Sequence, residues 1–338
     1  MRAMVLREPA PIAEAPLHLE DVPVPSPGPG QVRLRVLACG VCHTDLHTVE
    51  GELKAPRMPL IPGHQVVGVV EAGDVQAMGK RVHVGTRVGV PWLHWACGRC
   101  QYCRQGLENL CEQARFTGLD VDGGYGEYMV APAAFTVPIP DTFTPLQAAP
   151  LLCAGIIGYR SLRLSDLQPG ETLALFGFGA SAHLALQVAR YWGCPVFVYT
   201  RSRAHQQLAL DLGAAWAGTA EDRAPGLADR AITFAPAGAL IPRALQAVRK
   251  GGTVAINAVY LDGIPSFDYQ LIYGERTLRS VTNSTRQDAL EFLDLAARIP
   301  IRVETEVYPL EEANQALMAL KTRTLQGAGV LRIAPERP

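Results

Sequence analysis

The chain lacks both an excess of one charge and a long apolar run. Its 338 residues hold 31 Lys and Arg against 32 Asp and Glu, a formal net charge of −1. This balance argues against a surface for nucleic acid. No apolar run reaches the roughly 20 residues of a membrane-spanning helix, so we expect no membrane partner. The start, MRAMVLREPAP, lacks a signal-peptide core, so we expect a cytoplasmic protein.

Aromatic residues are also scarce, at 7%, whereas Gly (32) and Pro (26) are plentiful. This composition suits many short strands joined by tight turns. The length predicts about two domains. In the first half, alternating or apolar segments at 31–38, 65–72 and 87–90 predict strands of a compact barrel or sandwich.

The pattern changes near residue 150, where short apolar strands begin to alternate with helical segments. Expected strands are 172–176, 195–200, 231–234 and 253–257, and expected helices are 180–191 and 240–248. This alternation predicts an α/β fold with a parallel, doubly wound sheet. The tail, with helices at 286–297 and 310–320 around a strand at 302–308, is expected to return to the first half.

Half of the eight cysteines crowd one short segment, CGRCQYCRQGLENLC, with the spacing C-x2-C-x2-C-x7-C. Four thiolates this close can bind one tetrahedral metal ion and leave no open position, as in a structural zinc site. A ferredoxin-type iron–sulfur cluster has a shorter last gap followed by Pro, and disulfides are unusual in a cytosolic protein. We therefore predict a structural zinc site formed by Cys97, Cys100, Cys103 and Cys111.

A catalytic zinc needs three protein ligands and a free fourth position. Candidates outside the cluster are Cys42 in ACGVCHTDLH, His64 in IPGHQ and Cys153 in APLLCAG. Each is ambiguous by itself, because a buried Cys commonly packs as a small hydrophobe. Cys39 could pair with Cys42 in a C-x2-C motif, but its neighbours place it on a strand, and we predict a structural role for it.

Several of these segments together resemble one known family. GVCHTD, IPGH, the cysteine-rich segment, DGGYGEY (122–128) and LLCAG are similar, in order, to motifs of the zinc-dependent medium-chain alcohol dehydrogenases. The resemblance implies that Cys42, His64 and Cys153 ligate a catalytic zinc, making two Zn²⁺ per chain. It also implies a GroES-like β-barrel catalytic domain (1–152, with the structural zinc lobe at about 93–115), a Rossmann domain (153–288) and a C-terminal return to the catalytic domain (289–338).

The resemblance also implies a path for the substrate proton. Thr44 matches the hydroxyl that takes the alcohol proton, and His47 matches the histidine that passes it to solvent, a role that suits imidazole. Asp45 is expected to support His64, because ligating imidazoles usually donate their other N–H to a carboxylate or carbonyl. His43 could instead contact the cofactor, and its role stays open.

A glycine-rich turn follows the strand expected at 172–176 and opens the next helix. It reads G-F-G-A-S-A from Gly177 through Gly179 to Ala182, which in this context predicts a dinucleotide-binding loop. Gly177 would form the tight turn, Gly179 would admit the pyrophosphate, and Ala182 would allow close helix–strand packing. The anion would lie at the helix N-terminus.

The end of the next strand bears on the choice of dinucleotide. NAD-binding folds place an acidic residue there to hold the ribose 2′-hydroxyl, but this chain has Thr200, Arg201, Ser202 and Arg203. The arginines and hydroxyls could bind a 2′-phosphate, so we predict NADP(H) rather than NAD(H). The alternative is that the arginines are solvated surface charges.

The chain departs from the family at positions around the expected site. Gln65 replaces the acid that usually follows the ligand histidine, and 327–330 (GAGV) lacks an Arg that usually reaches the cofactor phosphates at the position of Ala328. Leu53 and Trp92 are expected to line the substrate pocket, and 157–158 (Ile-Gly) replaces a usual Thr pair near the nicotinamide. These changes predict an altered, roomier pocket.

Together these features predict an alcohol dehydrogenase, EC 1.1.1.-, that transfers hydride between NADP(H) and a primary aliphatic or aromatic alcohol or aldehyde. The resemblance implies a homodimer or homotetramer. Two alternatives stay open: a reductase of the same fold acting on activated C=C bonds or quinones, and a non-enzymatic NADPH-binding protein.

Overall fold

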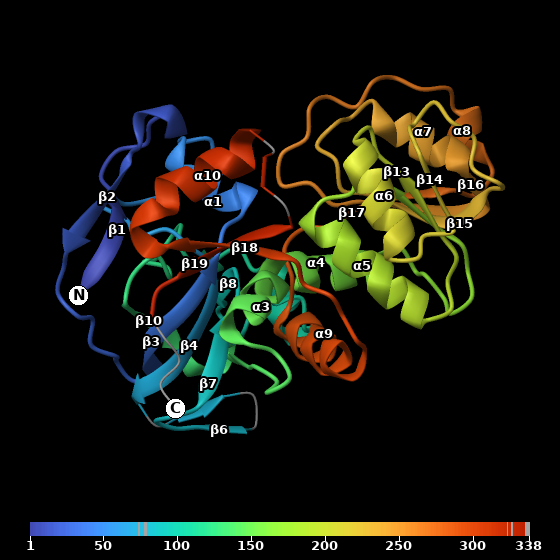
Figure 1. Cartoon of the computed structure of the whole chain (residues 1–338). Helices are drawn as coiled ribbons and strands as arrows, with labels where there is room; N and C mark the ends of the chain where they lie inside the picture. The colour runs from blue at the N-terminus through green and yellow to red at the C-terminus, as the bar shows by residue number, and fades with distance from the viewer. Residues whose placement is uncertain (74, 78–79, 323, 326, 335–338) are drawn as a thin grey trace. The chain divides into compact units, whose positions relative to one another are not determined.

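The computed structural model describes residues 1–73, 75–77, 80–322, 324–325 and 327–334, and the chain packs as two compact units (Figure 1). Unit 1 comprises 1–153, 283–297 and 303–338, and unit 2 comprises 154–282 and 298–302. The chain therefore leaves unit 1 once, forms unit 2, and returns. The domain bounds expected from the sequence stay a prediction.

Unit 1 is built around one mainly antiparallel sheet. Its strands, in spatial order, are β11 (Val137–Pro138), β7 (Arg87–Val90), β4 (Gln65–Ala72), β3 (Gln31–Gly40), β19 (Ala328–Arg332) and β18 (Thr305–Pro309), with β10 (Tyr128–Pro132) also paired to β3. Only the β18–β19 pair is parallel among the described strands of this sheet. The strands expected at 31–38, 65–72 and 87–90 are confirmed. The first of them is two residues longer than expected and ends at Gly40.

Smaller elements surround this sheet. They are the strand pairs β1 (Arg2–Leu6) with β2 (Leu17–Asp21), β5 (Val75–Ala77) with β6 (Lys80–Val82), and β8 (Leu93–Trp95) with β9 (Arg115–Phe116); the helices α1 (His43–Val49), α2 (Gln101–Arg104), α3 (Pro145–Pro150), α9 (Arg286–Arg298) and α10 (Ala313–Thr322); and the short turns η1 (Ile12–Glu14), η2 (Glu108–Leu110), η3 (Ala133–Phe135), η4 (Leu151–Gly155) and η5 (Leu310–Glu312). α10 packs against α1 and β19.

The alternation of the β3 sequence explains the main core of unit 1. Val32, Leu34 and Val36 are all completely buried, while the residues between them stay partly accessible. This period of two is that of a strand with one covered face. Toward its end, β3 becomes buried on both sides, including Cys39, which has the structural place expected for it.

Unit 2 contains a parallel sheet in the order β14 (Trp216–Gly218), β13 (Val196–Tyr199), β12 (Leu173–Phe176), β15 (Ala228–Thr233), β16 (Val248–Ile256) and β17 (Thr277–Ser280). Numbered along the chain, this is the order 3-2-1-4-5-6 of the dinucleotide-binding fold. The connecting helices are α4 (Ile156–Leu164), α5 (Ala180–Tyr191), α6 (Arg203–Asp211), α7 (Leu240–Ala247) and α8 (Gln270–Tyr273). The predicted α/β fold class with a doubly wound sheet is confirmed.

Several element boundaries differ from the sequence expectation, and β15 and β18 begin at Ala228 and Thr305 rather than at 231 and 302. β16 begins at Val248, directly after α7, rather than at 253, because Gly251 adopts a φ of +72° and the chain passes through an irregular register beside Ala228. The tail helix expected at 310–320 begins instead as the η5 turn, and α10 itself starts at Ala313.

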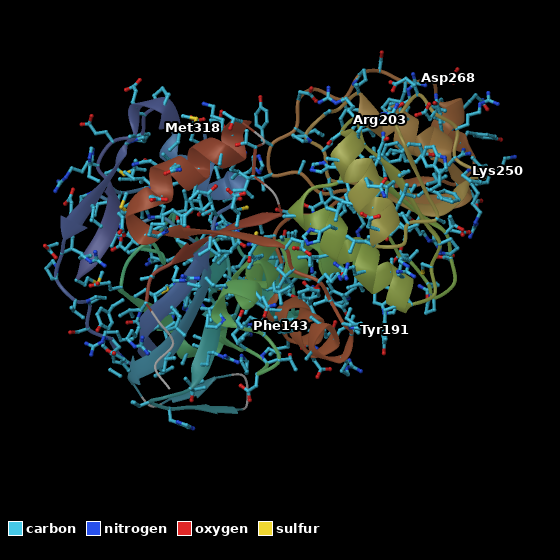
Figure 2. All side chains as sticks on the ribbon, in the orientation of Figure 1. Phe143, Tyr191, Arg203, Lys250, Asp268 and Met318 are labelled. Atoms are coloured by element: carbon cyan, nitrogen blue, oxygen red, sulfur yellow. The ribbon has the colours of Figure 1, made fainter. Side chains whose placement is uncertain are left out.

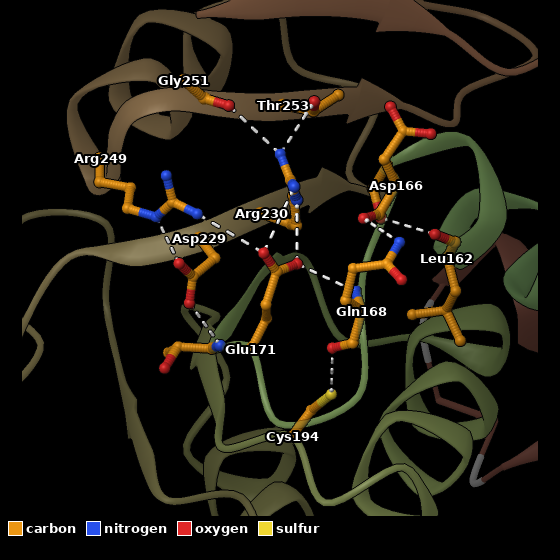
Figure 3. Close-up of polar contacts among 12 residues, drawn as sticks. Leu162, Asp166, Gln168, Glu171, Cys194, Asp229, Arg230, Arg249, Gly251 and Thr253 are labelled. Atoms are coloured by element: carbon orange, nitrogen blue, oxygen red, sulfur yellow. Dashed lines mark hydrogen bonds and ion pairs between the residues drawn. The ribbon is translucent and has the colours of Figure 1, made fainter.

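An ionic cluster joins the amino ends of three strands in unit 2 (Figure 3). Glu171, which precedes β12, accepts hydrogen bonds from Arg230 at 3.1 and 3.3 Å, and Arg249 pairs with Asp229. Nearby, Cys194 donates to the carbonyl of Gln168 at 3.4 Å and is 3% exposed. These contacts stabilise the amino end of the sheet. Ligands of such folds bind at the other end, outside the carboxyl ends of the strands.

No helix within the described ranges is long and apolar enough to cross a membrane.

Candidate active site

The three expected ligands of the catalytic metal meet within unit 1. The two Sγ atoms and a ring nitrogen of Cys42, His64 and Cys153 all lie within 4.8 Å of one another. Cys42 precedes α1, His64 precedes β4, and Cys153 lies in η4. η4 is a π-helical turn, and such turns frequently occur at functional sites. Residues more than 100 positions apart along the chain are thus brought to one point.

Asp45 fixes the orientation of this group. Its Oδ2 accepts a hydrogen bond from the Cys42 amide at 3.0 Å, and its Oδ1 lies 2.7 Å from Nδ1 of His64. His64 is 0% exposed, and its Nε2 finds no hydrogen-bond partner within the described residues. An unpaired buried imidazole nitrogen is costly unless something binds it. One imidazole and two thiols form a donor set that fits Zn²⁺.

Of the three side chains, only Cys42 has a pKa shifted toward the form that binds a metal. A hydrogen bond from the Cys153 thiol holds the pKa of Cys42 well below its usual range, although burial opposes this. The same hydrogen bond, together with burial, raises the pKa of Cys153. Burial lowers the pKa of His64, but Asp45 and Cys42 outweigh it and raise the value to about 10. Metal binding to these residues would therefore release protons.

Close packing beside His64 leaves no room for a side chain at the preceding residue, Gly63. Gly63 has a φ of +99°, and a Cβ there would lie 2.3 Å from the ring of Tyr125 and 2.9 Å from Sγ of Cys39. On another side the Trp92 ring meets the His64 ring edge-on, with centroids 4.8 Å apart, and stacks on Phe116 at 5.1 Å. Trp92, expected in the substrate pocket, is thus next to the metal ligands.

The predicted proton path follows one face of α1. Thr44 is 6% exposed, and its hydroxyl lies 3.9 Å from Sγ of Cys42. His47 follows three residues later, so the two side chains lie on the same helix face. The His47 side chain is 22% exposed, and its Nδ1 contacts the carboxylate of Glu52. The first residue is therefore beside the metal ligands and the second reaches toward solvent.

The remaining departures from the family have varied environments. Gln65 is 3% exposed, and its Oε1 lies 2.6 Å from where a Cβ of Gly40 would be. Leu53 is partly buried and donates its amide to the carbonyl of His47. Gly158 packs so closely on α5 that a Cβ would lie 2.9 Å from the carbonyl oxygen of Ser181. Helix packing, rather than pocket size, therefore accounts for this glycine.

The four clustered cysteines also converge, with all sulfur atoms within 4.8 Å of one another. No disulfide joins any of the cysteines, all of which lie in the described ranges. Backbone amides of the segment point at the sulfurs: Cys100 N lies 3.4 Å from Sγ of Cys97, and Cys97 N lies 3.5 Å from Sγ of Cys111. Such amides from Arg99 and Cys100 lower the pKa of Cys97 to about 6. The loop is folded around a tetrathiolate site.

Contacts within unit 1 hold this cysteine-rich segment in place. Leu93, Ala96 and Phe135 pack with the segment as a small apolar cluster. Glu108, which is 6% exposed, accepts from Arg286 of α9 at 2.9 Å, and the Arg286 guanidinium lies over the Phe135 ring at 4.9 Å. Because the Arg286 side chain is 36% exposed, this ion pair fixes orientation more than it adds stability.

The glycine-rich loop of unit 2 has the expected shape. Gly177 adopts a φ of +89°, and a Cβ there would lie 2.8 Å from the amide nitrogen of Ala235. Gly179 is the N-cap of α5, no side chain caps this helix, and a Cβ at Gly179 would meet no described atom within 4 Å. Ala182 is 0% exposed. Uncapped amides beside open space suit an anionic ligand.

The residues expected at the 2′-phosphate lie at the start of α6 (Figure 2). The side chains of Arg201 and Arg203 are exposed, and Arg203 donates to Oε1 of Gln206 at 3.2 Å. Ser202 caps the helix by accepting from the His205 amide at 3.3 Å, and the Thr200 carbonyl accepts from Gln206 at 2.8 Å. Ser202 therefore has a structural role besides any ligand role.

Sequence reasoning missed three side chains of these sites. Glu52 is one of them: it lies five residues after His47, and the turn at Gly51 brings it back to the His47 ring. Tyr125, 0% exposed, packs against Gly63, and its place in the DGGYGEY motif was the available signal. His183, 4% exposed in the first turn of α5, has an Nε2 without a partner in the described part of the chain. An apolar helix conceals such a histidine in the sequence.

Comparisons with known proteins agree with this arrangement. Residues 28–141 match the family described as the alcohol dehydrogenase GroES-like domain, and residues 182–298 match the zinc-binding dehydrogenase family. The chain is 48% identical to a probable alcohol dehydrogenase AdhA of Mycobacterium tuberculosis, covering 98% of this chain and 97% of that protein. It is 37% identical to an alcohol dehydrogenase of Geobacillus stearothermophilus, covering 98% and 99%.

A solved structure supports the same assignment. A cinnamyl alcohol dehydrogenase of Sorghum bicolor superposes with a TM-score of 0.88 at 27% identity, covering 100% of this chain and 99% of that one. The resemblance noted from the sequence motifs is confirmed, as is the GroES-like architecture of unit 1. The chain belongs to the zinc-type medium-chain alcohol dehydrogenases, and its relatives support alcohol dehydrogenase activity.

Proposed function

We propose that this alcohol dehydrogenase depends on zinc, prefers NADP(H), and acts on primary aliphatic or aromatic alcohols and aldehydes. Cys42, His64 and Cys153 would hold the catalytic zinc, and Cys97, Cys100, Cys103 and Cys111 the structural one. The observation that carries the proposal is the buried Nε2 of His64, which has no partner among the described residues, on a ring that has a nitrogen within 4.8 Å of two thiol sulfurs.

When bound, the zinc supplies a Lewis acid for the substrate oxygen and the nicotinamide supplies or accepts a hydride. The chain's own residues then handle the proton. The Thr44 hydroxyl, beside Cys42, takes the proton of the alcohol, and His47 passes it to solvent. In the reverse direction the same residues deliver a proton to the oxygen of an aldehyde. Trp92 and Phe116 offer an aromatic wall that excludes water and favours an apolar substrate.

Charge at the start of α6 supports the dinucleotide preference. Arg203 occupies the first turn of this helix, where the helix dipole makes a cation unfavourable. Arg201 lies one residue before the capping Ser202, and no acidic residue occupies this segment. A 2′-phosphate would satisfy both guanidinium groups and the helix amides. Preference for NADP(H) would in turn favour aldehyde reduction in a cell.

Metal analysis joined to a substrate panel tests the proposal. The purified protein is expected to hold two equivalents of zinc per chain and to oxidise NADPH with aldehydes. If the protein reduces activated C=C bonds or quinones but not aldehydes, the alternative reductase function replaces the proposed one. Metal binding without any turnover would replace it by the non-enzymatic alternative. Substitution of Ser for Cys153 should remove one zinc and the activity together.

We also propose that the chain forms a homodimer or homotetramer. Unit 2 exposes large apolar side chains after β16, among them Val259 (69%), Tyr269 (65%) and Tyr273 (65%). An exposed apolar group of this kind favours association. Sedimentation at micromolar concentration gives the subunit number, and a monomer there would contradict the proposal.

A further inference from the structure

One buried position of α6 carries a polar side chain. The buried residues of this helix are Gln206 and Ala209, and Gln206 is 7% exposed. An amphipathic helix usually presents apolar residues at such positions. An amide there needs hydrogen-bond partners, because a buried polar group without them is costly. The partners of Gln206 therefore indicate what the amide does.

The Gln206 amide joins two groups at the start of α6. Its Nε2 donates to the carbonyl of Thr200 at 2.8 Å, and its Oε1 accepts from Nη1 of Arg203 at 3.2 Å. The opposite orientation would set the NH2 group against a guanidinium and the oxygen against a carbonyl, so the two partners fix which way the amide points. The Thr200 carbonyl thus anchors the amide, and the amide holds the guanidinium.

Thr200 is a firm anchor because its backbone belongs to the edge of the sheet. Its amide donates to the carbonyl of Gly218 at the end of β14 at 2.8 Å, so both of its backbone polar groups have partners. Thr200 directly follows β13, and folds of this type hold the adenosine ribose of the dinucleotide at that place. Gln206 therefore ties the Arg203 guanidinium to the backbone beside the expected ribose.

A neutral acceptor leaves the charge of Arg203 in place. Gln206 occupies one of the five N–H donors of the guanidinium, and the others remain for the oxygens of a phosphate. Asp222 has its partners within its own loop. Hydrogen bonds from the amide and hydroxyl of Thr219, at 2.8 and 2.9 Å, lower the pKa of Asp222 most, and the charge of Arg203 lowers it less.

We propose that Gln206 is a positioning residue for the choice of dinucleotide: it holds Arg203 where the 2′-phosphate of NADP(H) binds. A free Arg side chain loses rotamer entropy when it binds an anion, and a guanidinium that is already held loses less. This gain applies only to a dinucleotide that carries the phosphate. Gln206 therefore widens the difference in affinity between NADPH and NADH. The inference rests on the proposed preference for NADP(H).

Binding of NADPH and NADH to the whole protein, followed by nicotinamide fluorescence, tests the proposal without turnover. We expect Gln206→Leu to weaken NADPH binding by roughly three- to ten-fold, because Arg203 is then ordered only on binding. NADH binding should stay within about two-fold, because NADH has no 2′-phosphate. The matched control is Gln207→Leu, at the exposed neighbour that donates to Asp211 at 2.8 Å, and it should match the wild type.

Gln206→Glu separates charge from orientation. A carboxylate can still accept from Arg203, but it cancels the charge of the guanidinium and cannot donate to Thr200. We expect this variant to weaken NADPH binding by about ten-fold or more, with NADH binding again within about two-fold. It also supplies the test if the Leu variant does not fold.

A double-mutant cycle distinguishes positioning of Arg203 from a structural effect on α6. In an Arg203→Ala background, Gln206→Leu should change NADPH binding by less than about two-fold, because its partner is already absent. An equal loss in both backgrounds would overturn the proposal, as would a Gln206→Leu protein that binds NADPH as tightly as the wild type. A wild type that binds NADH as tightly as NADPH would instead overturn the proposed preference for NADP(H).

Discussion

Asp45 and His64 form a hydrogen bond of 2.7 Å at a place where their side chains are 1% and 0% exposed. The other carboxylate oxygen of Asp45 accepts the amide of Cys42 at 3.0 Å. One side chain thereby sets both the start of α1 and the tautomer of a candidate ligand. Because Nδ1 of His64 donates to Asp45, Nε2 is the ring nitrogen that can release its proton and bind a metal ion.

Substitution of Asn for Asp45 should therefore weaken metal binding. The amide can donate to Nδ1 and place the ring proton on Nε2, where it blocks coordination. We expect metal affinity to fall by roughly 10- to 100-fold, the usual effect of removing such a partner. Competition with a coloured chelator measures this change. Asp141→Asn, at an exposed partner of Arg87, is the control, and equal zinc retention in both variants would contradict the argument.

The two glycines of the cofactor loop should respond differently to Ala. At Gly179 a Cβ meets no described atom and φ is −105°, so Gly179→Ala should change the free energy of unfolding by less than about 0.5 kcal/mol. It should still raise KM for the dinucleotide, because the methyl group occupies the space that a pyrophosphate needs. Gly177→Ala, at a φ of +89°, should cost more than about 1 kcal/mol.

Urea denaturation and dinucleotide titration of both variants measure these effects. The two glycines thus serve as controls for one another. If a folded Gly179→Ala variant binds the dinucleotide normally, the proposal that the pyrophosphate binds at this loop is wrong.

The arginines before and within α6 should decide between dinucleotides. Arg203→Ala removes a charge-assisted contact to a 2′-phosphate, and we expect kcat/KM with NADPH to fall by roughly ten-fold or more. The value with NADH should stay within about two-fold, since NADH lacks that phosphate. Arg243→Ala, an exposed arginine on α7, is the matched control. An equal loss of kcat/KM with NADPH and NADH would indicate that Arg203 stabilises α6 and does not bind the 2′-phosphate.

The cysteine-rich segment should lose its metal without loss of the catalytic site. Cys103→Ser removes one of four sulfurs, and we expect zinc content to fall from two equivalents toward one. The remaining zinc should stay with the Cys42 group, because the two clusters lie on separate segments of unit 1. Thermal unfolding should begin at a lower temperature, since structural zinc binding contributes to folding. Two equivalents of zinc in the variant would contradict the assignment of Cys103 as a ligand.

The sequence predicted most of the elements because their patterns are local. The helix expected at 180–191 is found with the same bounds, and strand β4 likewise, because apolar period and flanking Gly residues decide both. The cysteine cluster was equally accessible, since its four ligands lie within 15 residues. The start of β16 could not be predicted in this way. Pairing with β15 extends the strand through a Gly pair, although glycine disfavours a strand.

The surroundings of the site depend on contacts that no local pattern contains. His64 and Cys153 are 89 positions apart, and their convergence with Cys42 was expected only through the family resemblance. Tyr125 meets Gly63 across 62 positions, and Phe116 stacks on Trp92 across 24. Glu52 reaches His47 only because Gly51 takes a left-handed φ, which the sequence permits without requiring it.

His183 predicts how the stability of unit 2 depends on pH. Burial lowers its pKa from 6.5 to about 4, against hydrogen bonds to the carbonyls of Gly179 and Ala180 that raise it. The folded state therefore prefers the neutral ring. Above pH 6.5 both states are neutral and the residue has no effect. As pH falls from 6.5 toward 4, the unfolded chain takes up a proton first, so about 3 kcal/mol of stability is lost.

Substitution of Gln for His183 removes this titration. The variant is expected to start with lower stability, because Gln fills the buried site less well, but to lose less of it on acidification. Between about pH 7.5 and 5, the free energy of unfolding of the wild type should fall by roughly 2 kcal/mol more than that of His183→Gln. Urea unfolding at both pH values measures the difference, in which the packing cost cancels. Parallel pH profiles for the two proteins would mean that the pKa of His183 is the same in the folded and unfolded states, and the neutral buried ring would have to be abandoned.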